Sequence, residues 1–306
     1  MKLKRTFYKI LIFSPAYLLG WIAAIARLTN VGSSLIPSDP DGYRDRLQAY
    51  APIVAAGDKL AELDDTAAGP ERKTAVVLEL APILDVRYPI LEGTRFGVGA
   101  DLDARRPIIR SLARIRHEIE SAFRTASEKH DLRTQARLCA IGLRLSGVMR
   151  YSDSQSHLQS TNSFEAWLRR SLKIAPQVPI EQLARIAAAL DQLKAWSRPV
   201  ATIFRNEFAL YIVRNHRWTN DWQRSDAAQI VSEAFKSACE GESLKPVLVR
   251  VAQWQTSGEK QIVWEMLCDW QIAMNEEAKF QKQIQTASAD LRAEQLRKHR
   301  TESNAL

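Results

Sequence analysis

Apolar residues recur every three or four positions along most of this 306-residue chain, the spacing of one buried face of an α-helix. A stripe between Leu183 and Leu193 is the clearest, and Pro179 precedes it. Another stripe runs from Ala227 to Ala238 and is ended by Gly241, and a long final helix is predicted from about Lys260 towards Arg297. The pattern predicts an all-α fold whose short connections join antiparallel helical hairpins.

Glycine and proline divide the chain into three parts. Eight of the 12 glycines and eight of the 12 prolines lie at or before position 107. We therefore expect a cytoplasmic tail and anchor helix at 1–30, a punctuated linker with short helices at 31–103, and a helical-hairpin domain at 104–300. Within the linker the prediction comprises helices near Tyr43–Ala56 and Thr74–Leu84, a loop at 64–70 and irregular structure over 88–103.

The N-terminal segment has the pattern of a signal anchor. Four basic residues among the first nine precede the seventeen uncharged residues Ile10–Ala26, and Arg27 follows. Seventeen helical residues span about 26 Å, close to the hydrocarbon thickness of a bilayer. Because basic residues stay on the cytoplasmic side, the segment predicts a single-pass membrane protein with its N-terminus inside and its body extracytoplasmic.

Two other interpretations of this segment remain open. The small residues Ala24-Ile25-Ala26 suit signal-peptidase cleavage after Ala26, which would give a secreted or periplasmic protein. A helix buried in a soluble protein is the other alternative, since seventeen residues is on the short side for a membrane span.

Three stretches resemble tetratricopeptide-type helix pairs: residues 137–149, 163–168 and 179–186. The same region, roughly 105–240, resembles a group of uncharacterised bacterial proteins with an N-terminal anchor and such helices. The resemblance implies a scaffold for protein contacts, and it carries no functional residue over to this chain.

Positive charge is concentrated in one region of the chain. Between Arg105 and Arg150 there are ten arginines and one lysine against four acids, close to the whole net charge of +8. Arg106, Arg110 and Arg114 are predicted to share one helical face. In an exported protein such a face suits anionic lipid headgroups or acidic envelope polymers, and we expect no nucleic-acid partner. A solvated helix face is the alternative.

Glu207 is a candidate buried carboxylate, because it lies inside the apolar stripe of residues 200–212. Such a group needs a cationic partner, with Arg169, Arg170 or Arg205 as candidates, or it acts as a perturbed catalytic acid.

The polar-aromatic run after it holds a second candidate surface. Its residues are His216, Trp218, Asp221 and Trp222. They suit contact with a sugar or peptide, or they cap a helical core.

The remaining chemistry is sparse. The histidines and the three cysteines show no metal-ligand spacing, and no phosphate loop or nucleophile elbow occurs, so we expect no metal and no cofactor. The favoured function is a membrane-tethered scaffold or interaction protein of the cell envelope with a protein partner. The alternatives are an envelope enzyme acting on glycan or peptide through Glu207 or Asp221, and an accessory subunit of a membrane complex.

Overall fold

The computed structural model is helical throughout the part of the chain that it describes. It describes residues 48–64, 69–84, 98–149, 154–195, 204, 223–256 and 259–304. The all-α prediction is confirmed for these residues. None of their helices is long and apolar enough to cross a bilayer. The predicted anchor, Ile10–Ala26, lies outside the described residues.

The two short N-terminal helices lie at different positions from those predicted. Helix α3 spans Ala51–Glu62 and helix α4 spans Gly69–Leu78. Each begins with a proline in its first turn, at Pro52 and Pro70, where proline's missing N–H would have no helical partner anyway. A Gly-Pro pair in the sequence therefore marks a helix start here rather than a loop.

Helix α5 is the longest element of the first part of the fold, and it spans Val98–Glu128. The prediction that residues 88–103 are irregular is therefore wrong from Val98 onward, whereas residues 85–97 are not described. Pro107 lies inside the helix, where it removes one hydrogen bond without ending it.

Helices α6, Leu132–Met149, and α7, Ser154–Ile174, pack tightly and antiparallel. Ser146 lies beside Ser163, with 3.3 Å between their hydroxyls, and a Cβ added at Gly142 would lie 2.7 Å from Cγ of Trp167. Only glycine therefore fits where α6 crosses the Trp167 ring.

The predicted helix around the stripe 183–193 is confirmed as α8, Ile180–Ala195, which begins directly after Pro179. The following elements are α10, Gln223–Cys239, the short α11, Lys245–Arg250, and a 3₁₀ helix, η1, at Ala252–Thr256. The predicted end of α10 at Gly241 is also confirmed: Gly241 has φ +76°, and Glu242 N–H donates to the Ser237 carbonyl at 2.8 Å.

The last helix, α12, spans Glu259–Asn304 and extends beyond the predicted range at its C-terminal end. It joins two hydrophobic clusters. Its first half packs with α10 and α11 around Trp270, which stacks on Phe204 with ring centroids 4.5 Å apart. Its second half packs on α7 and α8 through a stripe that includes Phe280 and Ile284.

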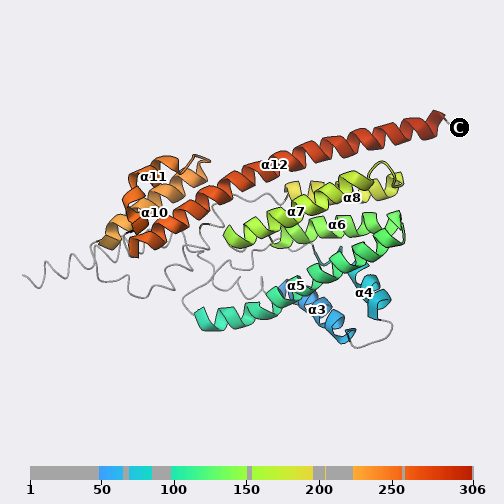
Figure 1. Cartoon of the computed structure of the whole chain (residues 1–306), viewed down its shortest axis with the longest axis horizontal. Helices are drawn as coiled ribbons and strands as arrows, with labels where there is room; N and C mark the ends of the chain where they lie inside the picture. The colour runs from blue at the N-terminus through green and yellow to red at the C-terminus, as the bar shows by residue number, and fades with distance from the viewer. Residues whose placement is uncertain are drawn as a thin grey trace, which may run out of the picture.

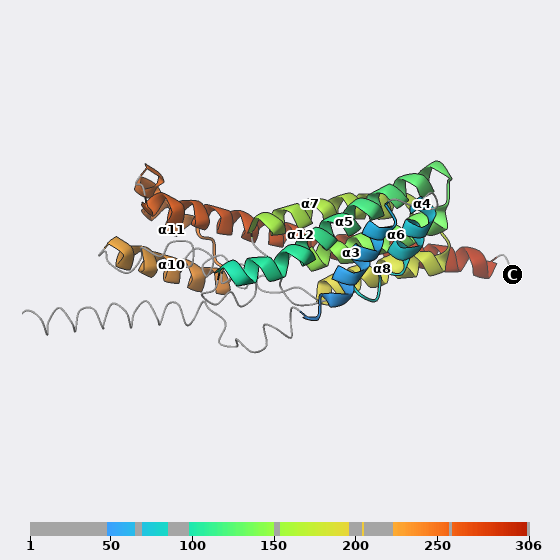
Figure 2. The same cartoon turned by 90° about the horizontal axis from the view of Figure 1, so that it is seen from below.

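The helices form successive layers, as Figure 1 and the perpendicular view in Figure 2 show. Helices α3 and α4 pack on α5, α5 packs on α6, α6 packs on α7 and α8, and α12 covers α7 and α8. Helix α5 therefore lies near one side of the molecule and α12 at the opposite side (Figure 1).

Candidate functional site

Helix α5 buries one stripe and leaves another exposed. The buried residues are Ile108, Leu112, Ile115, Ile119 and Ala122, at the three- and four-residue spacing of a helix face. Because α3 and α4 cover one flank and α6 and α7 lie behind it, only the side opposite this stripe is left to solvent.

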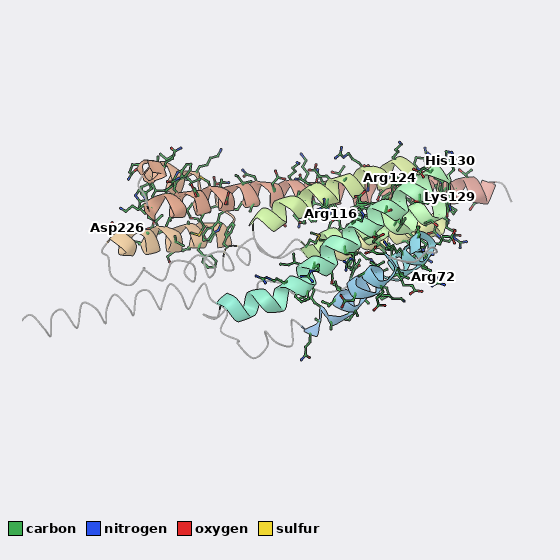
Figure 3. The ribbon with its side chains drawn as sticks, turned by 60° about the horizontal axis from the view of Figure 1, so that its bottom comes forward. Arg72, Arg116, Arg124, Lys129, His130 and Asp226 are labelled. Carbon is green, nitrogen blue, oxygen red and sulfur yellow. The ribbon has the colours of Figure 1, made fainter. Side chains whose placement is uncertain are left out.

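Arginines occupy the exposed side of α5 between Arg106 and Arg124. We define the basic face of α5 as Arg106, Arg110, Arg116 and Arg124, all of which are exposed. Arg106 and Arg124 are five helical turns apart, which places them in line over about 27 Å. Figure 3 shows Arg116 and Arg124 along the helix, with Lys129 and His130 at its end. Among the described residues, Arg110, Arg116 and Arg124 form no ion pair.

The carboxylates of α5 do not neutralise this face, because two of the three described ones are paired with other helices. Glu118 is only 9% exposed and accepts a hydrogen bond from Nζ of Lys73 at 3.1 Å. Glu120 pairs with Arg170 of α7, with 2.8 Å between Oε2 and Nη1. Of the acids on the helix between Arg106 and its end, only Glu128 has no ion-pair partner among the described residues.

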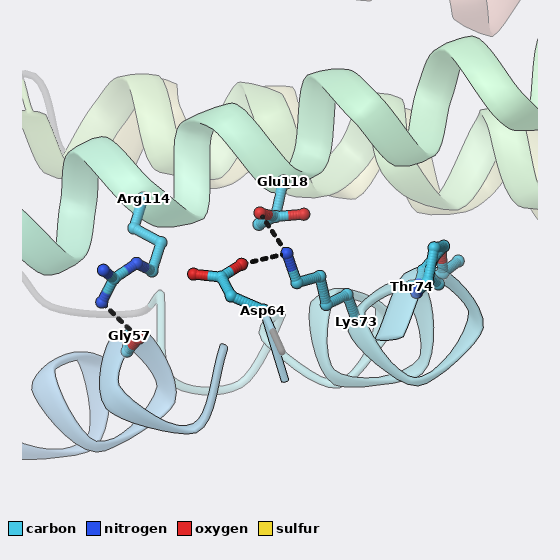
Figure 4. A network of polar contacts seen from close by, with 7 residues as sticks. Gly57, Asp64, Lys73, Thr74, Arg114 and Glu118 are labelled. Carbon is cyan, nitrogen blue, oxygen red and sulfur yellow. Dashed lines mark hydrogen bonds and ion pairs between the residues drawn. The ribbon is translucent and has the colours of Figure 1, made fainter. Parts of the chain in front are cut away.

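Lys73 joins α3, α4 and α5 at one point, as Figure 4 shows. Its ammonium donates to Asp64, after the end of α3, and to Glu118 of α5. The hydrogen bond from Lys73 lowers the pKa of the Asp64 carboxyl, and the same contact raises the pKa of Lys73. These charges hold the three helices together.

Arg114 is not part of the basic face, although the sequence groups it with Arg106 and Arg110. It is half-buried, and its Nη1 donates to the backbone carbonyl of Gly57 in α3 at 3.2 Å (Figure 4). Arg114 lies at the edge of α5 next to α3, so its guanidinium bonds to the α3 backbone and does not face solvent with the other arginines. Arg116 and Arg124 are the members that sequence reasoning missed, although the eighteen-residue spacing from Arg106 to Arg124 was a usable signal.

An exposed isoleucine interrupts the arginines. Ile109 is 52% exposed, one of few large apolar side chains on the described surface, and it lies between Arg106 and Arg110 in the sequence. Ala113, one turn further along, is exposed as well. The basic face of α5 thus combines guanidinium groups with a small apolar surface.

A guanidinium sandwich borders this face on the α7 side. Arg170 lies over the rings of Phe123 and Trp167, at 4.9 and 4.4 Å from their centroids, while it pairs with Glu120. Trp167 is 1% exposed, so this group packs α5 against α7 and is structural.

A hollow lies on the other flank, between α4, α5 and the start of α6. It has a volume of about 610 Å³ and carries both signs of charge, from Glu71, Lys73, Glu118, Lys129 and Asp131. Asp131 caps α6 by accepting the Thr134 N–H at 3.0 Å, and hydrogen bonds from the side chain and the backbone of Thr134 lower the pKa of Asp131. Because several of its polar groups serve the fold, the groove does not point to one ligand class.

The other candidate residues fall outside the described part of the chain. Glu207, His216, Trp218, Asp221 and Trp222 are in this group, so their proposed roles stay predictions.

The described residues were also compared with the requirements of a metal site and of a reactive thiol. No group of three or more His, Cys, Asp or Glu residues among them is placed to hold a metal ion. Burial raises the pKa of Cys139 to about 12, which makes this thiol a packing residue in α6.

Comparison with protein families, with curated proteins and with solved structures finds no match to this chain.

Proposed function

We propose that this chain is a membrane-tethered, extracytoplasmic helical scaffold that contacts an anionic partner surface in the cell envelope. The observation that carries the proposal is the exposed basic face of α5, in which Arg110, Arg116 and Arg124 form no ion pair with the described residues. Its arginines are exposed while Glu118 and Glu120 are paired with other helices. Exposed guanidinium groups recognise carboxylates and phosphates, and their summed field attracts anionic partners.

The tether comes from the sequence pattern of Ile10–Ala26 and the basic residues before it. The antiparallel packing of α6 on α7 supports a stack of helical hairpins of the tetratricopeptide type, whose exposed surfaces serve protein contacts. In this proposal the helical body provides the contact surface, and the N-terminal segment anchors it on the outer side of the membrane.

The tether is tested by extraction and topology. The full chain should stay with membranes at alkaline pH, a C-terminal reporter should be active outside the cytoplasm, and the intact mass should include residues 1–26. Leu18→Arg, in the middle of the apolar segment, should release the protein, because a central arginine costs about 3 kcal/mol on insertion. Extraction of the unaltered chain at alkaline pH, or a mature N-terminus at Arg27, would overturn the tether.

The contact surface is tested by photo-crosslinking in intact membranes. A photoreactive amino acid at Ala113, on the basic face of α5, should form adducts that decrease in the triple variant Arg110→Gln, Arg116→Gln, Arg124→Gln. The matched site is Ala184, exposed on α8, where adducts should be few and unaffected by the triple variant. Equal adduct yields at the two positions would contradict a contact surface on α5.

A further inference from the structure

We infer that the basic face of α5 lies against the anionic headgroups of the same membrane that carries the N-terminal anchor. The inference deepens the proposed function and rests on it for the tether. It names the partner surface as anionic lipid and gives the body an orientation, with α5 towards the bilayer and α12 away from it.

The basic face of α5 is complementary in charge to a layer of anionic headgroups. Arg110, Arg116 and Arg124 have no ion-pair partner among the described residues, and a planar guanidinium forms paired hydrogen bonds with a phosphate. Each basic residue near an anionic leaflet strengthens association about fivefold, so three of them together contribute about 100-fold.

The shape and apolar content of the face favour a lipid surface over a polymer chain. Arg106, Arg110 and Arg116 lie on the exposed side of a helix, and Arg124 lies at the edge of a hollow that Phe123 and Arg170 also line, so most of the face suits a broad surface. Ile109, 52% exposed next to Arg110, offers an apolar side chain that can enter the boundary between headgroups and acyl chains. A polyanion would gain nothing from this isoleucine.

The start of α3 lies near the arginines and Ile109 of the basic face. Helix α3 runs alongside α5 in the same direction, because Gly57 contacts Ser111 and Arg114 while Asp64, further along, reaches Glu118 through Lys73. The start of α3 therefore lies towards the N-terminal half of α5, where Arg106, Ile109 and Arg110 are.

The connection between the predicted anchor and the described fold is short enough to keep the basic face near the membrane. About twenty residues separate the end of the predicted anchor from the start of the described fold, a reach of at most about 70 Å. This reach keeps the body near the bilayer and so raises the effective concentration of the basic face at the membrane surface, so a face of weak intrinsic affinity would still be occupied.

The test uses the full chain in lipid nanodiscs and the photoreactive amino acid at Ala113. One set of discs contains only zwitterionic phosphatidylcholine, and the other contains about a third of anionic phosphatidylglycerol. We expect lipid adducts at Ala113 in the anionic discs, with a decrease of about tenfold or more in the zwitterionic discs and in high salt. The triple variant Arg110→Gln, Arg116→Gln, Arg124→Gln should show the same decrease in the anionic discs.

The control removes equal charge from the opposite side of the molecule. Arg185, Lys194 and Lys282 are exposed on α8 and α12 and form no ion pair with described residues, so their triple change to glutamine should leave the Ala113 adducts unchanged. Equal melting temperatures of both triple variants exclude a folding effect.

The outcomes separate the inference from the proposed function. Failure of the unaltered chain to enter either disc would overturn the tether. Insertion without anionic-lipid adducts at Ala113, equal adducts in both disc types, or an equal loss in the control variant would overturn the lipid inference alone. Adducts at Ala113 that form only with protein in intact membranes would instead assign the face to an acidic protein partner, and would also overturn it.

Discussion

Replacing Gly57 by alanine tests the contact between α3 and α5 that sets where the chain enters the fold. In the middle of a helix this change normally stabilises a protein by about 1 kcal/mol, because alanine is the better helix former. Here the added methyl group would lie 2.5 Å from Cβ and 2.8 Å from Cα of Ser111. Carbon atoms in good contact are about 3.5–4.0 Å apart, so the two helices would have to separate by about 1 Å.

The expected magnitude follows from these opposing effects. Overpacking costs about 1–3 kcal/mol, and the upper end applies because the Ser111 Cα belongs to the backbone and cannot rotate away. Separation would also lengthen the 3.2 Å hydrogen bond from Arg114 to the Gly57 carbonyl. After subtracting the gain in helix propensity, we expect a net loss of about 2 kcal/mol, which corresponds to a fall in Tm of about 4–8 °C.

Thermal unfolding of the full chain in detergent micelles, followed by circular dichroism, measures this effect. Asp58→Ala is the matched control, since Asp58 is the exposed neighbour on the same helix and its change should leave Tm equal or slightly higher. The double variant Gly57→Ala, Ser111→Gly should recover part of the loss, because it removes the nearest side-chain atoms. A Tm for Gly57→Ala at or above that of the unaltered protein would refute the close contact.

Two further predictions concern stability. Glu165 of α7 accepts hydrogen bonds from Lys279, at 2.6 Å, and from Gln283, at 3.1 Å, both in α12, and the bond from Lys279 lowers the pKa of this carboxyl below 4.5. Because the pKa of Glu165 is lower in the folded than in the unfolded state, its ionisation stabilises the fold at pH values above the unfolded-state pKa. This stabilisation is lost as the pH falls through the folded-state pKa. Glu165→Gln should therefore lower Tm at pH 7 and have little effect near pH 3. An equal effect at both pH values would argue against the charge pairing. His130 ends α5 with φ +55°, and Asp131 N–H donates to the Ala126 carbonyl at 2.9 Å, so His130→Gly should raise stability by about 1 kcal/mol in chemical denaturation. A loss of stability in this variant would show that the histidine side chain matters more than the backbone conformation.

The sequence predicted a helix boundary correctly where the residue at that boundary is a glycine or a proline, because these residues strongly favour particular backbone conformations. Gly241 after α10 and Pro179 before α8 are examples, and the structure has both where the pattern places them. The end of α5 at His130 has the same left-handed geometry without a glycine, and it carries no comparable signal in the sequence. The predicted positions of α3 and α4 differ from the observed ones, because a proline in the first turn of a helix and a proline in a loop give the same signal in the sequence.

The sequence by itself determined the all-α class, the excess of arginine between residues 105 and 150, and the pattern of the predicted anchor, because each depends on local composition and periodicity. The tertiary structure decided which of these charges face solvent. Arg114 bonds to Gly57, Glu118 pairs with Lys73 and Glu120 pairs with Arg170, and each partner lies more than forty residues away along the chain. No periodicity within α5 encodes such pairs, because a side chain is paired or left exposed by the helices that pack beside it. The basic face consists of the arginines of α5 that stay exposed after α3, α4 and α7 have packed against the helix.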